Sequence, residues 1–236
     1  FIDWFENKIS TDATFITTAG KGLRRISGGQ AAYYIPNIVD PSIETGRAFE
    51  ANCDVDLIFA CGSFDKYGED PRKTTVDLIR KHLPQIEFPE HVSFETGGLW
   101  GIDYVEALGH SKCGLNLSRE REGPLNLATP DDLYIYSSDR VSHLTGNGVL
   151  TFTNSKYKID ELYSDEEMIY YDNDDDLVGK ITYFLENDEM RRKIAKKGWE
   201  KAHHHLNERL GAQFITDILY NDKFSYSYIW PTEKIV

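Results

Sequence analysis

Two spacings of apolar residues alternate along most of the chain. Short, nearly continuous apolar runs such as "DVDLIFACGS" (54–63) are typical of buried strands, whereas "RKTTVDLIRKHLP" (72–84) carries apolar residues three and four apart, as one face of a helix does. The pattern predicts strands at 12–19, 31–40, 54–63, 91–98, 112–119, 149–153 and 166–173. It predicts helices at 72–84, 102–111, 174–187, 188–207 and 208–222, and a short one within 137–148.

Strands that alternate with helices favour a parallel sheet with helices on both faces, an α/β fold. In such sheets ligands bind outside the carboxyl ends of the strands. The residues that follow the predicted strands are therefore candidates for a binding site. They are Gly62, Ser63, Gly97, Gly98, Ser118, Arg119 and Asn154.

The short helix within 137–148 carries Arg140 and His143 three positions apart, so both side chains share one face of it. The segment "GNG" ends the helix, and an apolar strand follows at once. We expect this geometry to set the helix against the ligand-binding edge of the sheet. Arg140 and His143 would then face the cleft, although a surface ion pair for Arg140 and a helix-surface position for His143 are the alternatives.

Charge narrows the range of partners. The formal net charge is −13, which disfavours general binding of nucleic acid or of anionic membranes, because both depend on positive charge. A phosphate-bearing ligand then requires a local cluster of basic side chains and backbone N–H groups. No apolar run approaches the roughly 18 residues of a membrane span.

The three cysteines cannot form a complete set of disulfides. Cys61 and Cys113 lie in apolar strand-like runs, so we expect both to be buried thiols. This favours a reducing compartment, and we predict a cytoplasmic protein.

Two segments are reminiscent of metal sites. His203, His204 and His205 are consecutive, so their side chains point in different directions around a helix. The run "DNDDD" (172–176) lacks the glycine and the distal glutamate of a calcium-binding loop, and it stands where a helix N-terminus is expected. We predict no metal site and no cofactor.

Three stretches carry a resemblance to a known family: "GIDYVEALGHSKCGLNLSR", "SSDRVSHLTGNGVLTFTN" and "MIYYDNDDDLVGKITYFLENDEMRRKIAKKGWEKAHHHLNERL". In this order they resemble the C-terminal, nucleotide-sugar-binding half of GT-B glycosyltransferases, and within those the group 1 branch that includes the CgeB-like proteins. The resemblance covers roughly residues 12–210. It implies a Rossmann-like sheet and transfer of a sugar from a nucleoside diphosphate sugar to a glycan or other acceptor.

The resemblance also implies a division of the chain. Residues 1–40 would be the end of an acceptor-side domain and the crossover, 41–53 a linker, 54–222 the donor-binding domain and 223–236 a C-terminal tail. The chain begins with Phe, so we expect it to be part of a longer protein whose acceptor-side domain supplies any general base. The aromatic tail would pack against that domain or form an oligomer contact.

Roles for the candidate residues follow from the charge of a diphosphate. Backbone N–H groups at Gly62-Ser63, with Gly97-Gly98, let an anion approach closely, and Lys66 is an additional cation. Arg119 and Arg140, with Ser118 beside the former, would bind phosphate oxygens, which a guanidinium does in bidentate fashion. GT-B enzymes generally work without a bound metal, which implies a metal-independent transferase.

One position departs from the family pattern. Where the resemblance implies a glutamate that contacts the ribose or sugar of the donor, this chain has His143. A neutral imidazole still forms a hydrogen bond with a hydroxyl, but it has no fixed negative charge. The departure favours one alternative, a non-catalytic nucleotide-sugar-binding or scaffold module of the same fold. A nucleotide-sugar epimerase, which shares the two-domain fold, is a further alternative.

Overall fold

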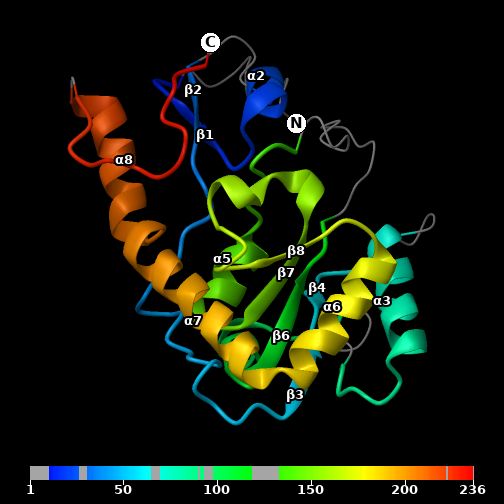
Figure 1. The fold of residues 1–236 in the computed structure, drawn as a ribbon. Coiled ribbons are helices and arrows are strands. Elements are labelled where there is room, and N and C mark those ends of the chain that lie inside the picture. The colour runs from blue at the N-terminus through cyan, green and yellow to red at the C-terminus, as the bar shows by residue number, and fades with distance from the viewer. Residues whose placement is uncertain are drawn as a thin grey trace.

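A parallel four-stranded sheet lies at the centre of the computed structural model (Figure 1). The structure describes residues 11–26, 31–64, 70–89, 91–92, 98–118, 133–221 and 223–235. The strand order is β3-β6-β7-β8, and all three pairings are parallel. These strands are β3 (Val55–Ile58), β6 (Ser111–Asn116), β7 (Leu150–Asn154) and β8 (Ile169–Tyr171). The predicted parallel α/β sheet is confirmed.

A second parallel pair continues the β3 edge of this sheet. Its strands are β4 (Ala60–Cys61) and β5 (His91–Val92), and only Phe59 separates β4 from β3. The run predicted as one strand at 54–63 is thus two short strands that pair with different neighbours. The remainder of the strand predicted at 91–98 lies outside the described residues up to Gly98.

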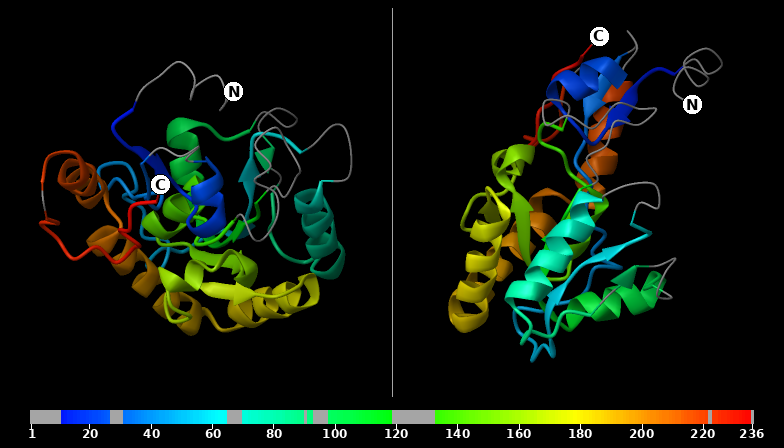
Figure 2. Two further views of the ribbon diagram at one scale, coloured as in Figure 1. Left: turned by 90° about the horizontal axis from the view of Figure 1, so that it is seen from above. Right: turned by 90° about the vertical axis from the view of Figure 1, so that its right-hand side faces the viewer.

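Helices cover both faces of the sheet (Figure 2). One face packs on α3 (Pro71–His82), α6 (Asp174–Glu186) and α7 (Asp188–His205), through side chains such as Ile79, Phe152 and Ile181. The other face packs on α4 (Gly101–Gly109) and α5 (Asp139–Gly146), through Ile58, Leu108 and Leu144. The apolar residues that recur at helical spacing in the sequence form the face that each helix packs against the sheet.

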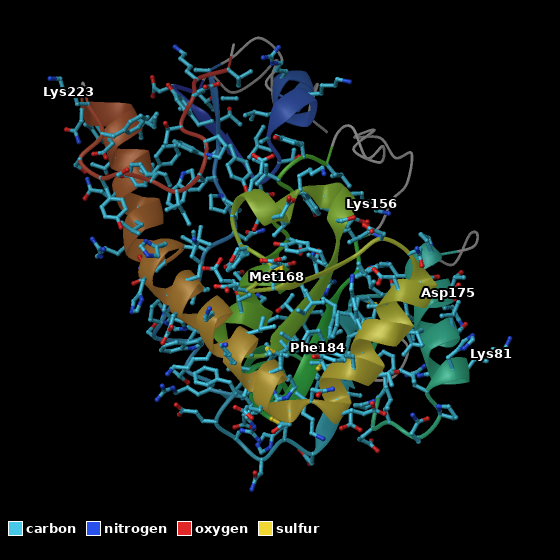
Figure 3. The ribbon with its side chains drawn as sticks, viewed as in Figure 1. Lys81, Lys156, Met168, Asp175, Phe184 and Lys223 are labelled. Carbon is cyan, nitrogen blue, oxygen red and sulfur yellow. The ribbon has the colours of Figure 1, made fainter. Side chains whose placement is uncertain are left out.

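Helices begin at the carboxyl edge of the sheet. Figure 3 labels Lys156, just after β7, and Asp175, in the first turn of α6, on the same side of the view, with Phe184 further along the helix. Asn173 caps α6 by accepting a hydrogen bond from the Asp176 N–H, and the first turn holds three aspartates. Both features stabilise a helix N-terminus, so the acidic run has a structural role here.

A separate cluster joins the two ends of the described chain. The strands β1 (Thr14–Ile16) and β2 (Ala32–Tyr34) pair in parallel around α2 (Gly20–Ile26). They pack with α8 (Glu208–Tyr220) and with the tail, whose Ile235 bridges to Ala32 (Figure 1). Within the described residues, no helix combines the length and apolar character that a bilayer span requires.

Asp217 attaches the tail to α8. The residue is only 1% exposed, and its carboxylate accepts hydrogen bonds from the Ser225 N–H, the Tyr228 hydroxyl and the side chains of Asn221 and Gln213. Burial alone would raise the pKa of this carboxyl, but the hydrogen bonds outweigh it and hold the pKa well below its usual range. The tail is therefore attached by hydrogen bonds to the buried Asp217 carboxylate as well as by aromatic contacts.

We expect Asp217→Asn to lower the free energy of unfolding by about 3 kcal/mol, because an amide leaves buried donors without an acceptor. A carboxyl whose folded-state pKa is depressed stabilises above its unfolded value and loses that contribution as the pH falls. The difference from the parent should therefore shrink below about pH 4. Urea denaturation at neutral and acidic pH measures it. Asp77→Asn, at an exposed ion pair with Lys73, is the control and should change little.

The cysteines give a second test of the fold. Cys61 and Cys113 are buried, as predicted, whereas Cys53 is partly exposed. Burial raises the pKa of the Cys113 thiol to about 12, and the reactive species is the thiolate. A thiol reagent at mildly alkaline pH should modify Cys53 first and the other two only on unfolding. The fast phase should vanish in Cys53→Ser; a fast phase that remains would contradict the packing described.

Candidate functional site

A cleft of about 290 Å³ lies at the carboxyl end of β4, beside the N-termini of α4 and α5. The backbone at the end of β4, two aromatic side chains and two basic side chains line it. The lining residues are Ala60, Cys61, Gly62, Leu99, Trp100, Gly101, Tyr104, Asp139, Arg140 and His143. Its position outside the strand ends is the one where ligands bind in parallel α/β sheets.

Hydrogen bonds to the sheet fix the start of α5. The N-cap residue Ser138 donates its hydroxyl to Asn116 Oδ1 at 2.8 Å, and Asn116 donates to Thr153 Oγ1 at 3.0 Å. All three residues are buried, and Asn116 and Thr153 lie at the carboxyl ends of β6 and β7. The first turn of α5 therefore has one defined position over the strand ends.

Arg140 extends from that first turn across the end of the sheet. Its Nε donates to the Ala60 carbonyl at 3.2 Å and its Nη1 to the Leu117 carbonyl at 3.0 Å. The guanidinium also lies 5.1 Å from the centroid of the Phe59 ring, within the range of a cation–π contact. These contacts place a positive charge at the wall of the cleft.

His143 lies one turn further along, on the same face of α5. Its Nδ1 is 2.8 Å from Oε1 of Glu44, whose side chain is only 4% exposed. The Tyr104 ring packs against the imidazole in a T-shaped arrangement, with the ring centroids 5.6 Å apart. Burial raises the pKa of Tyr104 to about 12, so its hydroxyl stays protonated near neutral pH.

The segment that carries Glu44 is attached to the C-terminus of α5. Asn147 accepts from the Gly46 N–H through Oδ1 and from the Ala48 N–H through its carbonyl, and it donates to the His143 carbonyl. A Cβ atom at Gly146 would lie 2.9 Å from Cβ and Cγ of Glu44, closer than real contacts allow. Glu44 is therefore held in a fixed position against α5.

A second, smaller cleft of about 90 Å³ lies across the ends of β6, β7 and β8. Ser118, Asn154 and Lys156 line it together with Arg72 and Asp174. The hydroxyl of Ser118 is buried and forms no hydrogen bond with any residue that the structure describes. Ser118 therefore lines a different cleft from Arg140 and His143.

The N-terminus of α3 is already occupied by protein groups. Asp70 accepts from the Arg72 N–H and forms a buried ion pair with the Arg72 guanidinium, at 2.7 Å. The guanidinium also donates to the Ser63 carbonyl at 2.8 Å. At the N-terminus of α3, the Arg72 N–H and guanidinium are therefore both held by protein groups.

The structure brings Gly62, Arg140 and His143 together at one cleft, and Gly98 immediately precedes the lining segment 99–101. Ser63 lies beside Arg72, which bonds to its carbonyl. Ser118 lies in the smaller cleft. Lys66, Gly97 and Arg119 lie outside the described residues. A role of any of these residues in binding a donor stays a prediction.

Sequence reasoning missed Trp100, Tyr104, Asp139 and Glu44. Trp100 is 60% exposed. In the sequence, the usable signal was an aromatic residue directly before a glycine, just after a predicted strand. Tyr104 lies in the stretch predicted as a helix at 102–111, in which no side chain was assigned to the site. Glu44 gave no signal, because it lies in a polar stretch interpreted as a linker.

The predicted absence of a metal site stays a prediction. Within the described ranges, no three or more His, Cys, Asp and Glu side chains are arranged to bind a metal ion. His203, on α7, is within 2.9 Å of the Gly146 carbonyl through Nε2 and packs on the Trp199 ring. The first contact joins α7 to α5 and the second lies within α7, so both are structural.

Two solved structures share the fold. The glycosyltransferase from Rickettsia africae ESF-5 superposes with a TM-score of 0.58 at 10% sequence identity. The superposition covers 94% of this chain and 68% of the Rickettsia chain. The sucrose-phosphate synthase from Thermosynechococcus elongatus gives 0.57 at 12% identity, over 89% of this chain. The chain spans only 58% of the length of that synthase.

Sequence comparison gives the family. No curated protein matches the chain significantly. A family model described as "Glycosyl transferase-like" matches residues 63–216, which is more than half of the chain. The match includes all the strands of the central sheet except β3, and it includes Arg140 and His143. The chain therefore belongs to the glycosyl transferase-like family, and its fold is the GT-B fold of its structural neighbours.

Proposed function

We propose that the cleft between β4, α4 and α5 binds the diphosphate of a nucleoside diphosphate sugar, and that the protein transfers the sugar to a glycan or other acceptor. The observation that carries the proposal is the position of Arg140. Its guanidinium lines the cleft at the carboxyl end of the sheet, fixed by two main-chain carbonyls. A fixed guanidinium binds phosphate oxygens in defined directions.

The helix termini support the same assignment. Both α4 and α5 begin at the cleft, and neither N-cap side chain, Trp100 nor Ser138, bonds to the first turn of its helix. Backbone N–H groups and the helix dipole favour an anion there. Asp139 also lines the cleft, and the negative charge of its carboxylate disfavours an anion there. Its Oδ1 already accepts a hydrogen bond from the Arg140 N–H.

The chemistry of transfer calls for such a site. When the bond between sugar and diphosphate breaks, negative charge develops on the leaving diphosphate. A cation and N–H donors that are in place before the reaction stabilise that charge more in the transition state than in the ground state, which lowers the barrier. Arg140 is the group in this cleft suited to that role.

A panel of nucleoside diphosphates tests the proposal by thermal shift. A ligand at 100 times its Kd stabilises the folded state by about 2.7 kcal/mol, which for a chain of this size raises Tm by about 5–10 °C. If none of the nucleoside diphosphates raises Tm, the donor assignment is wrong.

Arg140→Ala should weaken binding of the preferred nucleoside diphosphate at least tenfold, because a charge-assisted hydrogen bond contributes about 1.5–3 kcal/mol. Titration calorimetry measures the loss. The ligand-free Tm should fall by only a few degrees, since water at the cleft replaces the lost partners of the two carbonyls.

Arg80→Ala is the matched control. Arg80 also donates to a main-chain carbonyl, that of Phe88, and lies 5.1 Å from the Phe88 ring centroid, but it sits in the last turn of α3, away from the cleft. It should lower Tm similarly and leave the affinity unchanged. Equal affinities of parent and Arg140→Ala would assign Arg140 a purely structural role.

A further inference from the structure

Glu44 is a buried carboxylate whose two oxygens have different partners. Oε2 accepts from the Asp40 N–H at 2.8 Å, and Oε1 lies 2.8 Å from Nδ1 of His143. The backbone N–H of Glu44 donates to the Asp40 carbonyl, which closes the turn. Neither oxygen lines the cleft, so Glu44 reaches the cleft only through His143.

The partners of Glu44 determine where the imidazole carries its proton. An ionised carboxylate accepts hydrogen bonds and donates none, so the short contact at 2.8 Å requires the proton on Nδ1 of His143. In the neutral imidazole, Nε2 is then an acceptor. Among the residues that the structure describes, none bonds to Nε2, while the side chain of His143 is 35% exposed and lines the cleft.

The surroundings keep the ring in this orientation. The Tyr104 ring packs edge-on against the imidazole at an interplanar angle of 85°, and Asn147 holds the carbonyl of His143. Gly46 and Gly146 allow the segment that carries Glu44 to approach α5 closely. A ring flip would break the contact with Glu44 and leave a buried carboxylate oxygen without a partner, which is costly.

We propose that Glu44 is a positioning residue that fixes His143 in the Nδ1–H tautomer, so that Nε2 accepts a hydrogen bond from a hydroxyl of the bound nucleotide sugar. The hydroxyl belongs to the ribose or to the transferred sugar, which present the same chemistry. The choice of ligand rests on the proposed function, whereas the tautomer does not.

The tautomer is tested on the ligand-free protein. The ¹⁵N chemical shifts of protonated and unprotonated imidazole nitrogens differ widely, so a histidine-labelled sample shows which nitrogen carries the proton. The signals of His143 are assigned by their loss in His143→Gln. We expect Nδ1 protonated and Nε2 unprotonated; a protonated Nε2 with a bare Nδ1 in the parent protein overturns the proposal whether or not any nucleotide binds.

Glu44→Gln should reverse the tautomer. Its amide oxygen keeps the hydrogen bond from the Asp40 N–H, because the opposite orientation would set two donors against each other. The amide NH₂ then donates to Nδ1, and the proton moves to Nε2. An unchanged tautomer in a folded Glu44→Gln protein would show that Glu44 does not set it.

Asp54→Asn is the matched control. Asp54 and His110 form another carboxylate–imidazole pair, 3.6 Å apart, but both side chains are well exposed, at 82% and 68%. This variant should leave the His143 signals unchanged. His110 in the same spectrum also shows how a solvent-exposed imidazole behaves.

The role in binding is tested by a double-mutant cycle with the preferred nucleoside diphosphate and with its sugar conjugate. Glu44→Gln and His143→Ala should each weaken binding about three- to tenfold. Because Glu44 acts through His143, adding Glu44→Gln to His143→Ala should cause no further loss.

A loss with both ligands assigns the ribose hydroxyl, and a loss with the sugar conjugate alone assigns the transferred sugar. Additive losses, or a reversed tautomer with unchanged affinity for both ligands, overturn the role in binding. A protein that binds no nucleotide at all contradicts the proposed function and leaves the tautomer measurement to decide the structural part.

Discussion

The close approach of α5 to the central sheet determines the geometry of the site. A Cβ atom at Gly114, in β6, would lie 2.2 Å from Cδ2 of Leu144, so the helix rests directly on the backbone of the strand. Leu144 is 1% exposed and lies one turn beyond Arg140, so its contact with the strand is made next to the face of α5 that carries Arg140 and His143. This contact sets the rotation of α5 over the sheet, and Arg140 and His143 line the cleft at the edge of the sheet.

The same contact explains why residues 40–48 belong to the site. The C-terminal end of α5 offers Asn147 as donor and acceptor, and the absence of a side chain at Gly146 lets Glu44 approach. A segment distant in the sequence thereby adds a buried negative charge behind His143. The cleft combines a cation held by strand-end carbonyls with an imidazole held by a carboxylate, and each directs polar atoms toward the space where a ligand would lie.

Hydrophobic periodicity predicted the sheet and its helices because both faces are buried. The strand predicted at 112–119 and the helix at 174–187 correspond to β6 and α6 within a few residues at each end. The break at Phe59 between β3 and β4 was not predictable, because strand pairing depends on partners far along the chain. The cleft-facing positions of Arg140 and His143 followed from helical spacing and from the rule that ligands bind at strand ends. Glu44 could not be found this way, since its role comes from a contact across 99 residues of sequence.

The central claim is that a diphosphate binds beside Arg140, and a crystal structure of the protein with its most stabilising nucleoside diphosphate tests it most directly. We predict phosphate oxygens within roughly 3 Å of the Arg140 guanidinium, in the cleft between β4, α4 and α5. A diphosphate bound instead in the smaller cleft, beside Lys156 and Ser118, with the cleft at Arg140 empty, would contradict the account.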